Sequence, residues 1–267
     1  MSVQTLYTAA TGMESLETKL DVIANNLANV NTVGFKKDRA NFEDLFYRNE
    51  VLPGAETQGS LTPTGIHIGL GSRVSSVQSN FGQGAFQLTN GQLDLAIEGN
   101  GFFPIEDPAT NQTLYTRAGN FSLNADGQIV MGSATGGRFL DPQISIPADA
   151  AGIVISADGN VSVRAGDQQQ LQQVGTIQLA SFANPDGLLK LGDNLFAETD
   201  ASSSARLGTP GQQGLGAIRQ NVLEMSNVEP VQELIDLITT QRAFELNSQT
   251  VQAGDQILQL VANLRRF

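Results

Sequence analysis

Apolar residues near the start of the chain recur at alternating spacings of three and four residues. The series consists of Leu6, Ala9, Met13, Leu16, Leu20, Ile23, Leu27 and Val30. This spacing places the side chains along one side of an α-helix and is typical of helices that pack lengthwise against other helices. We therefore expect a helix over residues 4–30, followed by an Asn-rich run in which Gly34 can adopt a left-handed conformation.

Residues near the end of the chain follow the same spacing. One series consists of Leu246, Ala253, Ile257, Leu260, Leu264 and Phe267, and a second, on another face, of Leu237, Phe244, Val251 and Leu258. Ser226 and Glu229 match a capping box, and Pro230 suits the first turn of a helix that begins near Ser226. The apolar positions cover about half of the helix circumference, which is more than one partner helix can bury.

The surplus apolar surface on both helices predicts a protein that finishes folding by assembling. The residues that we assign to this assembly interface are Leu6, Met13, Leu16, Leu20, Ile23, Leu27, Val30, Phe244, Leu246, Val251, Ile257, Leu258, Leu260 and Leu264.

From Ile66 onward the apolar period changes to two residues, which is the period of β-strands. Gly-containing turns separate the short apolar runs, at Asn90–Gly91, Asp126–Gly127, Asp158–Gly159 and Asn184–Gly187. Asn-Gly and Asp-Gly between such runs favour tight β-hairpins. Many short strands with turns of this kind indicate an antiparallel β domain.

The stretch between the first helix and the β region is rich in Pro and Gly. Because a loop of about thirty residues is unusual inside a compact domain, we expect an extended arm that packs against another surface. The predicted fold class is α+β, with long N- and C-terminal helices in a coiled-coil-like terminal domain, an antiparallel all-β middle domain and an extended connecting arm. The predicted boundaries are 1–38 for the N-terminal helix, 39–71 for the arm, 72–225 for the β domain and 226–267 for the C-terminal helix.

Composition narrows the classes of function. The chain has 267 residues and no Cys, which excludes disulfides, thiol nucleophiles and thiolate metal sites. The net charge of −12 lies mostly in the middle, which suits a solvated surface, while the nearly neutral ends suit close packing among identical copies. The chain has no basic stripe, so nucleic-acid binding is disfavoured. We expect no membrane span and no secretory signal peptide, because no apolar run has the length or the flanks that either requires.

Few residues offer catalytic or binding chemistry. His67 is the only histidine, and its place in an alternating run favours a strand surface residue over a base or ligand. Asn124–Gly127 lacks the other ligands of a calcium loop, and Gly99–Gly101 lacks the third glycine and the helix of a dinucleotide site. We therefore predict no catalytic residue, no metal site and no cofactor.

A basic cluster follows the first helix. Lys36, Lys37 and Arg39 could bind phosphate, but cations near a helix C-terminus also favour the helix dipole and keep a linker solvated. We prefer the second interpretation.

Three stretches of the chain together resemble the rod and hook family of axial proteins of the bacterial flagellum. The first runs from Ala24 to Lys36, the second comprises residues 97–103 and 115–121, and the third comprises residues 224–229 and 241–247. The residues that we assign to the family motif are Asn25, Asn26, Asn29, Asn31, Gly34, Phe35, Gly99, Gly101 and Phe102. The length and the arm segment at 59–71 are most similar to those of distal-rod members, while proximal-rod members share both ends and remain an alternative.

The resemblance implies a structural subunit that self-assembles into a rigid, hollow, helical drive shaft and transmits torque to the hook. It implies as partners further copies of itself, proximal rod proteins and the hook protein along the axis, P-ring and L-ring proteins around the rod, and the flagellar type III export apparatus. It also implies a place in the periplasm-spanning basal body, export without a cleaved signal peptide, and no enzymatic activity.

Two other classes of function remain open from the residues alone. A closed coiled-coil oligomer that displays a β domain for binding carbohydrate or protein explains the heptads but not the second apolar face. A β-domain hydrolase requires clustered acids in a cleft, such as Asp94 or Glu106, and sequence cannot show such a cleft.

Overall fold

The computed structural model describes residues 3–53, 56–57, 60–61, 64–108, 110–131, 137–165 and 170–264. The chain divides into two compact units. The first, which we call the helical unit, combines Met1–Ala28, Asp38–Ser79 and Glu229–Phe267. The second, which we call the β unit, combines Asn29–Lys37 with Asn80–Val228.

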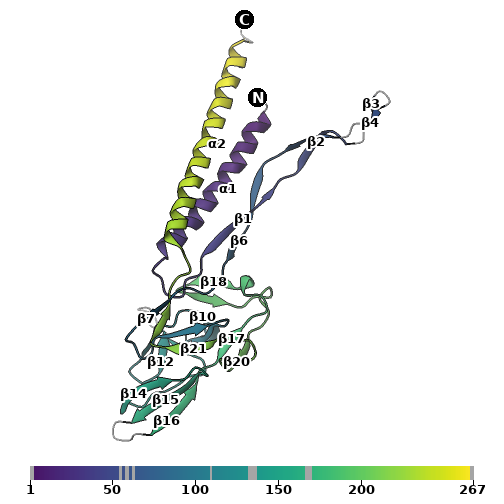
Figure 1. The fold of residues 1–267 in the computed structure, drawn as a ribbon. Helices are drawn as coiled ribbons and strands as arrows, with labels where there is room; N and C mark the ends of the chain where they lie inside the picture. The colour runs from purple at the N-terminus through teal and green to yellow at the C-terminus, as the bar shows by residue number, and fades with distance from the viewer. Residues whose placement is uncertain are drawn as a thin grey trace. The chain divides into compact units, whose positions relative to one another are not determined.

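The helical unit contains two long helices, α1 (Val3–Ala28) and α2 (Pro230–Leu264), which contact each other along their lengths (Figure 1). Pro230 occupies the first turn of α2, as predicted. The predicted capping box is wrong, because the Ser226 hydroxyl accepts a hydrogen bond from the Val228 backbone N–H (3.3 Å), upstream of the helix.

The predicted coiled-coil-like terminal domain is also wrong. A coiled coil buries a continuous seam of apolar side chains from both helices. Here Ala9 and Ile23 are the buried members of the N-terminal series, and the closest contacts involve small and polar residues. A Cβ atom added to Gly12 would lie 3.3 Å from the side-chain nitrogen of Asn247, and one added to Gly254 would lie 2.5 Å from Leu6. The two helices thus pack closely at small residues and do not form a heptad-based coiled coil.

The arm is a two-stranded hairpin that folds back on itself (Figure 1). β1 (Asp38–Asp44) pairs with β6 (Ser72–Ser79), β2 (Tyr47–Val51) with β5 (Ile66–Gly69), and β3 (Glu56–Thr57) with β4 (Ser60–Leu61). All three pairs are antiparallel. Hydrogen bonds between the two halves pair their backbone amide and carbonyl groups. α1 contacts both β1 and β6.

The β unit is built from short antiparallel strands. Its largest sheet has the order β11 (Phe121–Leu123), β12 (Ile129–Met131), β13 (Arg138–Leu140), β9 (Phe103–Asp107), β10 (Gln112–Thr116), β19 (Leu195–Ala197) and β18 (Leu189–Gly192). A three-stranded sheet contains β14 (Ala150–Ile155), β15 (Asn160–Ala165) and β16 (Leu171–Thr176). The two-stranded pairs are β17 (Leu179–Ser181) with β20 (Arg206–Gly208), β8 (Leu95–Glu98) with β21 (Ala217–Gln220), and β7 (Phe86–Leu88) with β22 (Val222–Glu224). A short 3-10 helix, η1, spans Pro185–Gly187.

Two of the predicted hairpins are confirmed. Asp126–Gly127 connects β11 to β12, and Asp158–Gly159 connects β14 to β15. The hairpin predicted at Asn90–Gly91 is wrong, because β7 pairs with β22 and β8 pairs with β21. Strands β22 and β21, from the C-terminal end of the unit, pair with β7 and β8, so these two strands do not pair with each other across Asn90–Gly91.

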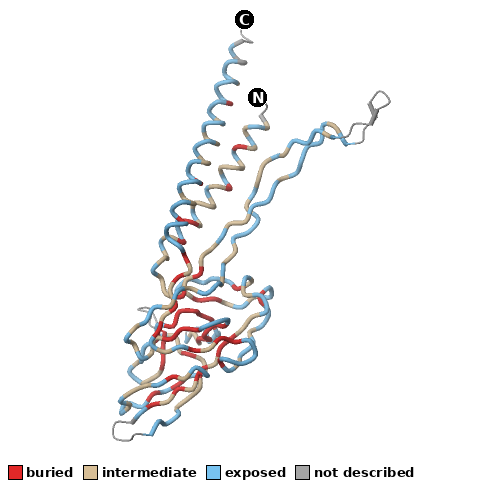
Figure 2. Tube along the Cα trace, viewed as in Figure 1, coloured by how far each residue is buried: buried red, intermediate tan, exposed pale blue. Residues whose placement is uncertain are grey.

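The apolar core of the β unit lies between these strands (Figure 2). Leu95, Ile97, Phe103, Ile105 and Leu140 have no measurable exposure. A second cluster is aromatic, and Phe102 makes edge-on contacts in it with Phe81, Phe182 and Phe196. The residues of the helices and the arm are more exposed than those of the β unit (Figure 2).

Candidate functional site

Helix α2 carries apolar residues on two opposite faces. The face toward α1 contains Phe244, Val251 and Leu258, which are half-buried, and Thr240, which is 2% exposed. The opposite face, which we call the outer face of α2, is open to solvent. Its members are Val231, Leu234, Ile235, Ile238, Leu246, Ile257 and Leu260, which are 36% to 71% exposed. At about 100° per residue, they lie within about 140° of the helix circumference.

The structure therefore separates the predicted assembly residues into two groups. Leu246, Ile257 and Leu260 lie on the outer face of α2, whereas Ile23 of α1 is buried. The half-buried members on α1 are Leu6, Met13, Leu16, Leu20 and Leu27. These α1 residues and the α1-facing residues of α2 pack within one chain.

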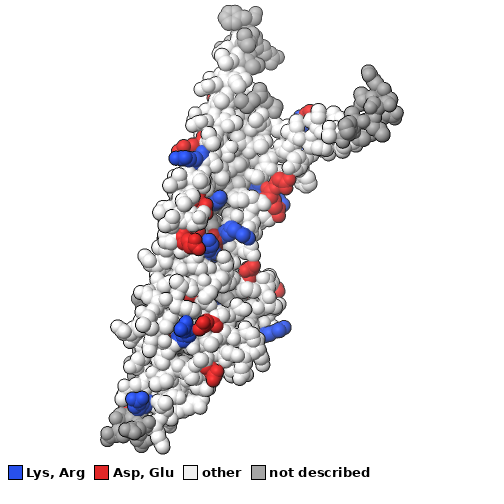
Figure 3. Space-filling view, in the orientation of Figure 1, with Lys and Arg blue, Asp and Glu red and all other residues white. Residues whose placement is uncertain are grey.

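Two predicted assembly residues lie elsewhere. Val30 is half-buried and belongs to the β unit, and the side chain of Leu264 lies outside the described residues. The outer face begins with four residues that were not predicted: Val231, Leu234, Ile235 and Ile238. Their spacing of three, one and three residues places them on one face of a helix and could have predicted this patch. Figure 3 shows that the visible surface over the helices carries few charged side chains.

The Asn residues of the motif have different surroundings. Asn26 is 2% exposed, while Asn25 and Asn31 are exposed. Asn29 is half-buried and accepts a hydrogen bond from the hydroxyl of Thr32 (3.0 Å). Only Asn26 thus combines a buried position with a polar side chain that must be satisfied internally.

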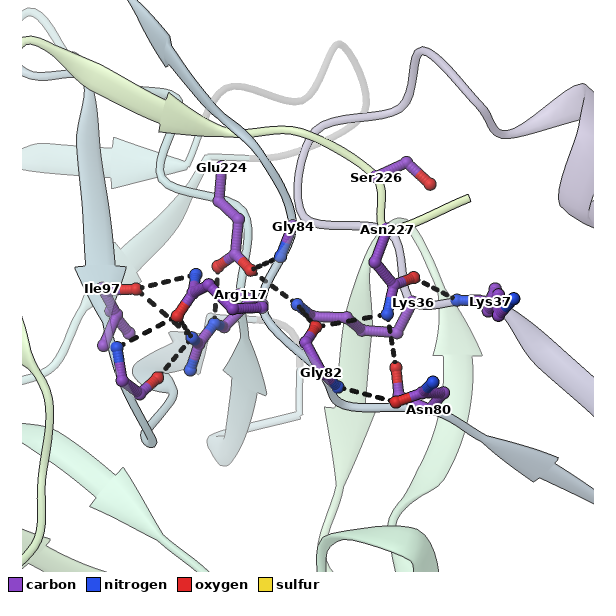
Figure 4. Close-up of polar contacts among 12 residues, drawn as sticks. Lys36, Lys37, Asn80, Gly82, Gly84, Ile97, Arg117, Glu224, Ser226 and Asn227 are labelled. Carbon is purple, nitrogen blue, oxygen red and sulfur yellow. Dashed lines mark hydrogen bonds and ion pairs between the residues drawn. The ribbon is translucent and has the colours of Figure 1, made fainter. Parts of the chain in front are cut away.

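Residues of all three motif stretches meet in the β unit around one carboxylate, that of Glu224 (Figure 4). Lys36 Nζ donates to Glu224 Oε1 (2.6 Å), and Arg117 Nε donates to Glu224 Oε2 (2.7 Å). The three side chains are 0%, 5% and 0% exposed for Lys36, Arg117 and Glu224. We call these three residues the buried ionic junction.

Backbone groups complete the junction. Arg117 also donates to the carbonyl oxygens of Gly99 (2.5 Å), Gly101 and Ile97 (3.3 Å). Lys36 Nζ donates to the carbonyl of Gly82 (2.7 Å). The motif glycines thus bring backbone carbonyls close to a guanidinium, in positive-φ conformations that suit glycine.

Gly34 connects the N-terminal motif stretch to the buried ionic junction. Its backbone N–H donates to the carbonyl of Glu224 (2.8 Å), and its φ of +68° confirms the predicted left-handed conformation. A Cβ atom at this position would lie 2.7 Å from the backbone nitrogen of Ala118. Neighbouring Phe35 is half-buried, with Lys190 Nζ 5.3 Å from its ring centroid.

The interpretation that Lys36 helps to keep a linker solvated is wrong. Burial lowers the pKa of Lys36 below its usual value, attraction and hydrogen bonding to Glu224 oppose this shift, and the nearby Arg117 charge adds to it. Glu224, 188 residues away in the chain, therefore stabilises the ammonium. Short-range sequence patterns cannot reveal a pairing over that separation.

The described residues provide little catalytic chemistry. Among them, no group of three His, Asp or Glu side chains is close enough to hold a metal ion. His67 is exposed on the arm, with its Nδ1 2.5 Å from Asn49 Oδ1. Within the described part of the chain, neither helix is both long and apolar enough to cross a membrane.

Comparison with known protein families gives three matches. Residues 6–36 match the family described as "Flagella basal body rod protein". Residues 96–163 match "Flagellar hook protein FlgE/F/G D1 domain", and residues 219–264 match "Flagellar basal body rod FlgEFG protein C-terminal". The three matches cover the same parts of the chain that carry the sequence motifs.

Full-length relatives agree with these matches. The flagellar basal-body rod protein FlgG of Caulobacter vibrioides is 47% identical over 98% of this chain and 100% of its own length. Its counterpart from Agrobacterium fabrum is 43% identical over 97% and 98%, and that from Borreliella burgdorferi is 41% identical over 99% and 99%. The predicted family resemblance is confirmed: the chain belongs to the flagellar rod and hook family, among the FlgG-type basal-body rod proteins, and is a structural subunit of that rod.

Proposed function

We propose that this chain is a subunit of the distal rod, where copies stack helically into a stiff, hollow drive shaft that transmits torque to the hook. The observation that carries the proposal is the outer face of α2, an apolar surface along a helix whose other side already packs on α1. Contacts between different patches of identical copies generate an open helical polymer when the rotation does not close. The outer face supplies one such patch.

The partners follow from this role. Related rod and hook proteins would extend the axis, ring proteins would surround the rod, and the export apparatus would deliver the chain. The similarity to family models named for rod and hook proteins supports the axial partners.

Substitution of the outer face tests the proposal. Ile235→Asp together with Ile238→Asp places two charges on side chains that are each 49% exposed, so the packing within one chain should be little affected. Burial of one Ile side chain contributes about 1.5–3 kcal/mol. Since about 1.4 kcal/mol equals a factor of ten, the concentration needed for assembly should rise at least about tenfold. Sedimentation of purified chains at increasing concentration measures it.

The control is Leu171→Asp, which changes an equally apolar, 52% exposed residue on β16 of the β unit. It should assemble much more readily than the α2 variant. Equal assembly of the α2 variant and the unmodified chain would refute the role of the outer face. A closed dimer or trimer at every concentration would refute the helical polymer.

A further inference from the structure

Helix α1 has a third side, distinct from its α2-facing and solvent-facing sides, which contacts the arm hairpin. The residues on this side, Thr8, Thr11, Ser15 and Asn26, lie within about 60° of the helix circumference at 100° per residue. Ser15 Oγ donates to the carbonyl of Ser72 on β6 (3.3 Å). A Cβ atom on Gly71 would collide with the Thr11 hydroxyl, so the hairpin approaches α1 closely there.

Asn26 forms the most complete contact on this side. Its Oδ1 accepts a hydrogen bond from the Asp38 backbone N–H (2.9 Å), and its Nδ2 donates to the Asp38 carbonyl (2.9 Å). The side-chain amide therefore satisfies both backbone groups of Asp38, the first residue of β1, much as a neighbouring strand would. The same Nδ2 lies 3.3 Å from Glu233 Oε2 of α2.

One buried side chain thus links α1, the base of the arm and α2. Asn26 is 2% exposed and Glu233 is 5% exposed, so water cannot readily replace these bonds. A two-stranded hairpin has little stability or fixed direction of its own. A hairpin also extends about 3.3 Å per residue, so a small rotation at Asp38 becomes a large displacement farther along the arm.

We propose that Asn26 is a positioning residue that fixes the direction of the arm relative to the helix pair. This inference rests on the proposed function, because the arm and the outer face of α2 must meet neighbouring copies in one defined geometry. The neighbouring Asn25 provides a matched control, since it is the same residue type on the same helix but is exposed.

Pulsed electron paramagnetic resonance can measure the arm's direction. The chain has no Cys, so Glu17→Cys on α1 and Val77→Cys on β6 introduce two unique label sites at exposed positions. A small fraction of labelled chains is diluted into unlabelled chains in the polymer, so that only distances within one chain are observed. The parent and Asn25→Ala should give one narrow distance distribution, and Asn26→Ala a distribution at least twice as wide. A narrow, unshifted distribution for Asn26→Ala would overturn the proposal.

A second pair of variants separates positioning from general misfolding. Asn26→Asp removes the amide donor and places a carboxylate against Glu233, so the distribution should broaden. Adding Glu233→Gln supplies an amide that can donate to the new carboxylate. The distribution should then narrow in part, because the Asp38 carbonyl still lacks its donor. Failure of this rescue would overturn the link to α2. The rescue can be tested even if Asn26→Ala chains do not enter the polymer.

The two proposals fail differently. If unlabelled, unmodified chains form no polymer, the proposed function fails. If a polymer forms and the Asn25→Ala and Asn26→Ala chains give equal widths in it, the role of Asn26 alone fails.

Discussion

At the scale of single residues, the buried ionic junction places three charged side chains inside the β unit. Two cations, Lys36 and Arg117, share the single carboxylate of Glu224, and all three side chains are almost completely buried. The carboxylate of Glu224 supplies the negative charge that offsets the cost of burying these two cations. The cluster as a whole keeps a net positive charge. Removing one partner of a buried ion pair leaves an uncompensated charge.

We predict that Glu224→Gln destabilises the β unit by about 3–5 kcal/mol, because both cations lose their counter-charge. Lys36→Met should cost much less, since Arg117 and Glu224 remain as a balanced pair. Urea unfolding of the full chain, followed by the β-sheet circular dichroism signal, measures both effects. The control Glu98→Gln removes an exposed contact to Arg219 (3.6 Å) and should change stability by at most about 1 kcal/mol. A Glu224→Gln loss no larger than the control's would contradict this account.

Sequence patterns could not identify these residues. Lys36 stands beside Lys37 just after a helix, where a solvated role is the simplest expectation. Its burial depends on Glu224 and Arg117, which are distant in sequence and approach it only in the folded structure. The glycines at 34, 99 and 101 were visible as a motif, but their purpose, to bring the backbone close to Arg117 and Glu224, required the structure.

At the scale of elements, the arm hairpin exposes more apolar surface than a solvated element needs. Phe46 is 87% exposed, Tyr47 54%, Leu52 61% and Ile66 52%. Apolar patches of this kind mark surfaces that become covered by a partner. We therefore expect the arm to lie between subunits and to contribute to the stiffness of the rod.

Deletion of residues 46–65 tests this role. It removes Phe46, Tyr47 and Leu52, the three most exposed large apolar side chains among the described residues of the arm. The assembled rods should therefore bend more easily, with a shorter persistence length in electron micrographs. The control, Arg48→Gln with Glu50→Gln, removes an exposed ion pair but keeps the apolar surface, and should leave stiffness unchanged. Rods of undiminished stiffness after the deletion would exclude a stiffening arm.

The elements differed in how well sequence predicted them. The helices were predictable because their apolar spacing persists over many turns, and the β11–β12 and β14–β15 hairpins because Asp-Gly favours tight turns. The partners of β7 and β8 come from the C-terminal strands β22 and β21, so local patterns gave the wrong pairing. The apolar spacing also suggested a coiled coil, but glycine and asparagine contacts replace a heptad seam between α1 and α2.

At the scale of the whole molecule, both units are assembled from segments that are distant in sequence. The β unit has a large apolar core, whereas the helical unit leaves the outer face of α2 and much of the arm exposed. Ordering a residue costs about 1–2 kcal/mol of backbone entropy. We therefore predict that the helix pair becomes stably ordered only when neighbouring copies cover it.

The most direct test of assembly through the outer face is limited trypsin digestion at Arg242, compared between dilute chains and the polymer. Arg242 is exposed and lies along the outer face of α2. We predict rapid cleavage there in dilute chains, with the β unit surviving as a resistant fragment, and strong protection in the polymer. Equally rapid cleavage at Arg242 in the polymer would contradict burial of this face between copies, and equal resistance in both states would show that the helices already have partners in solution.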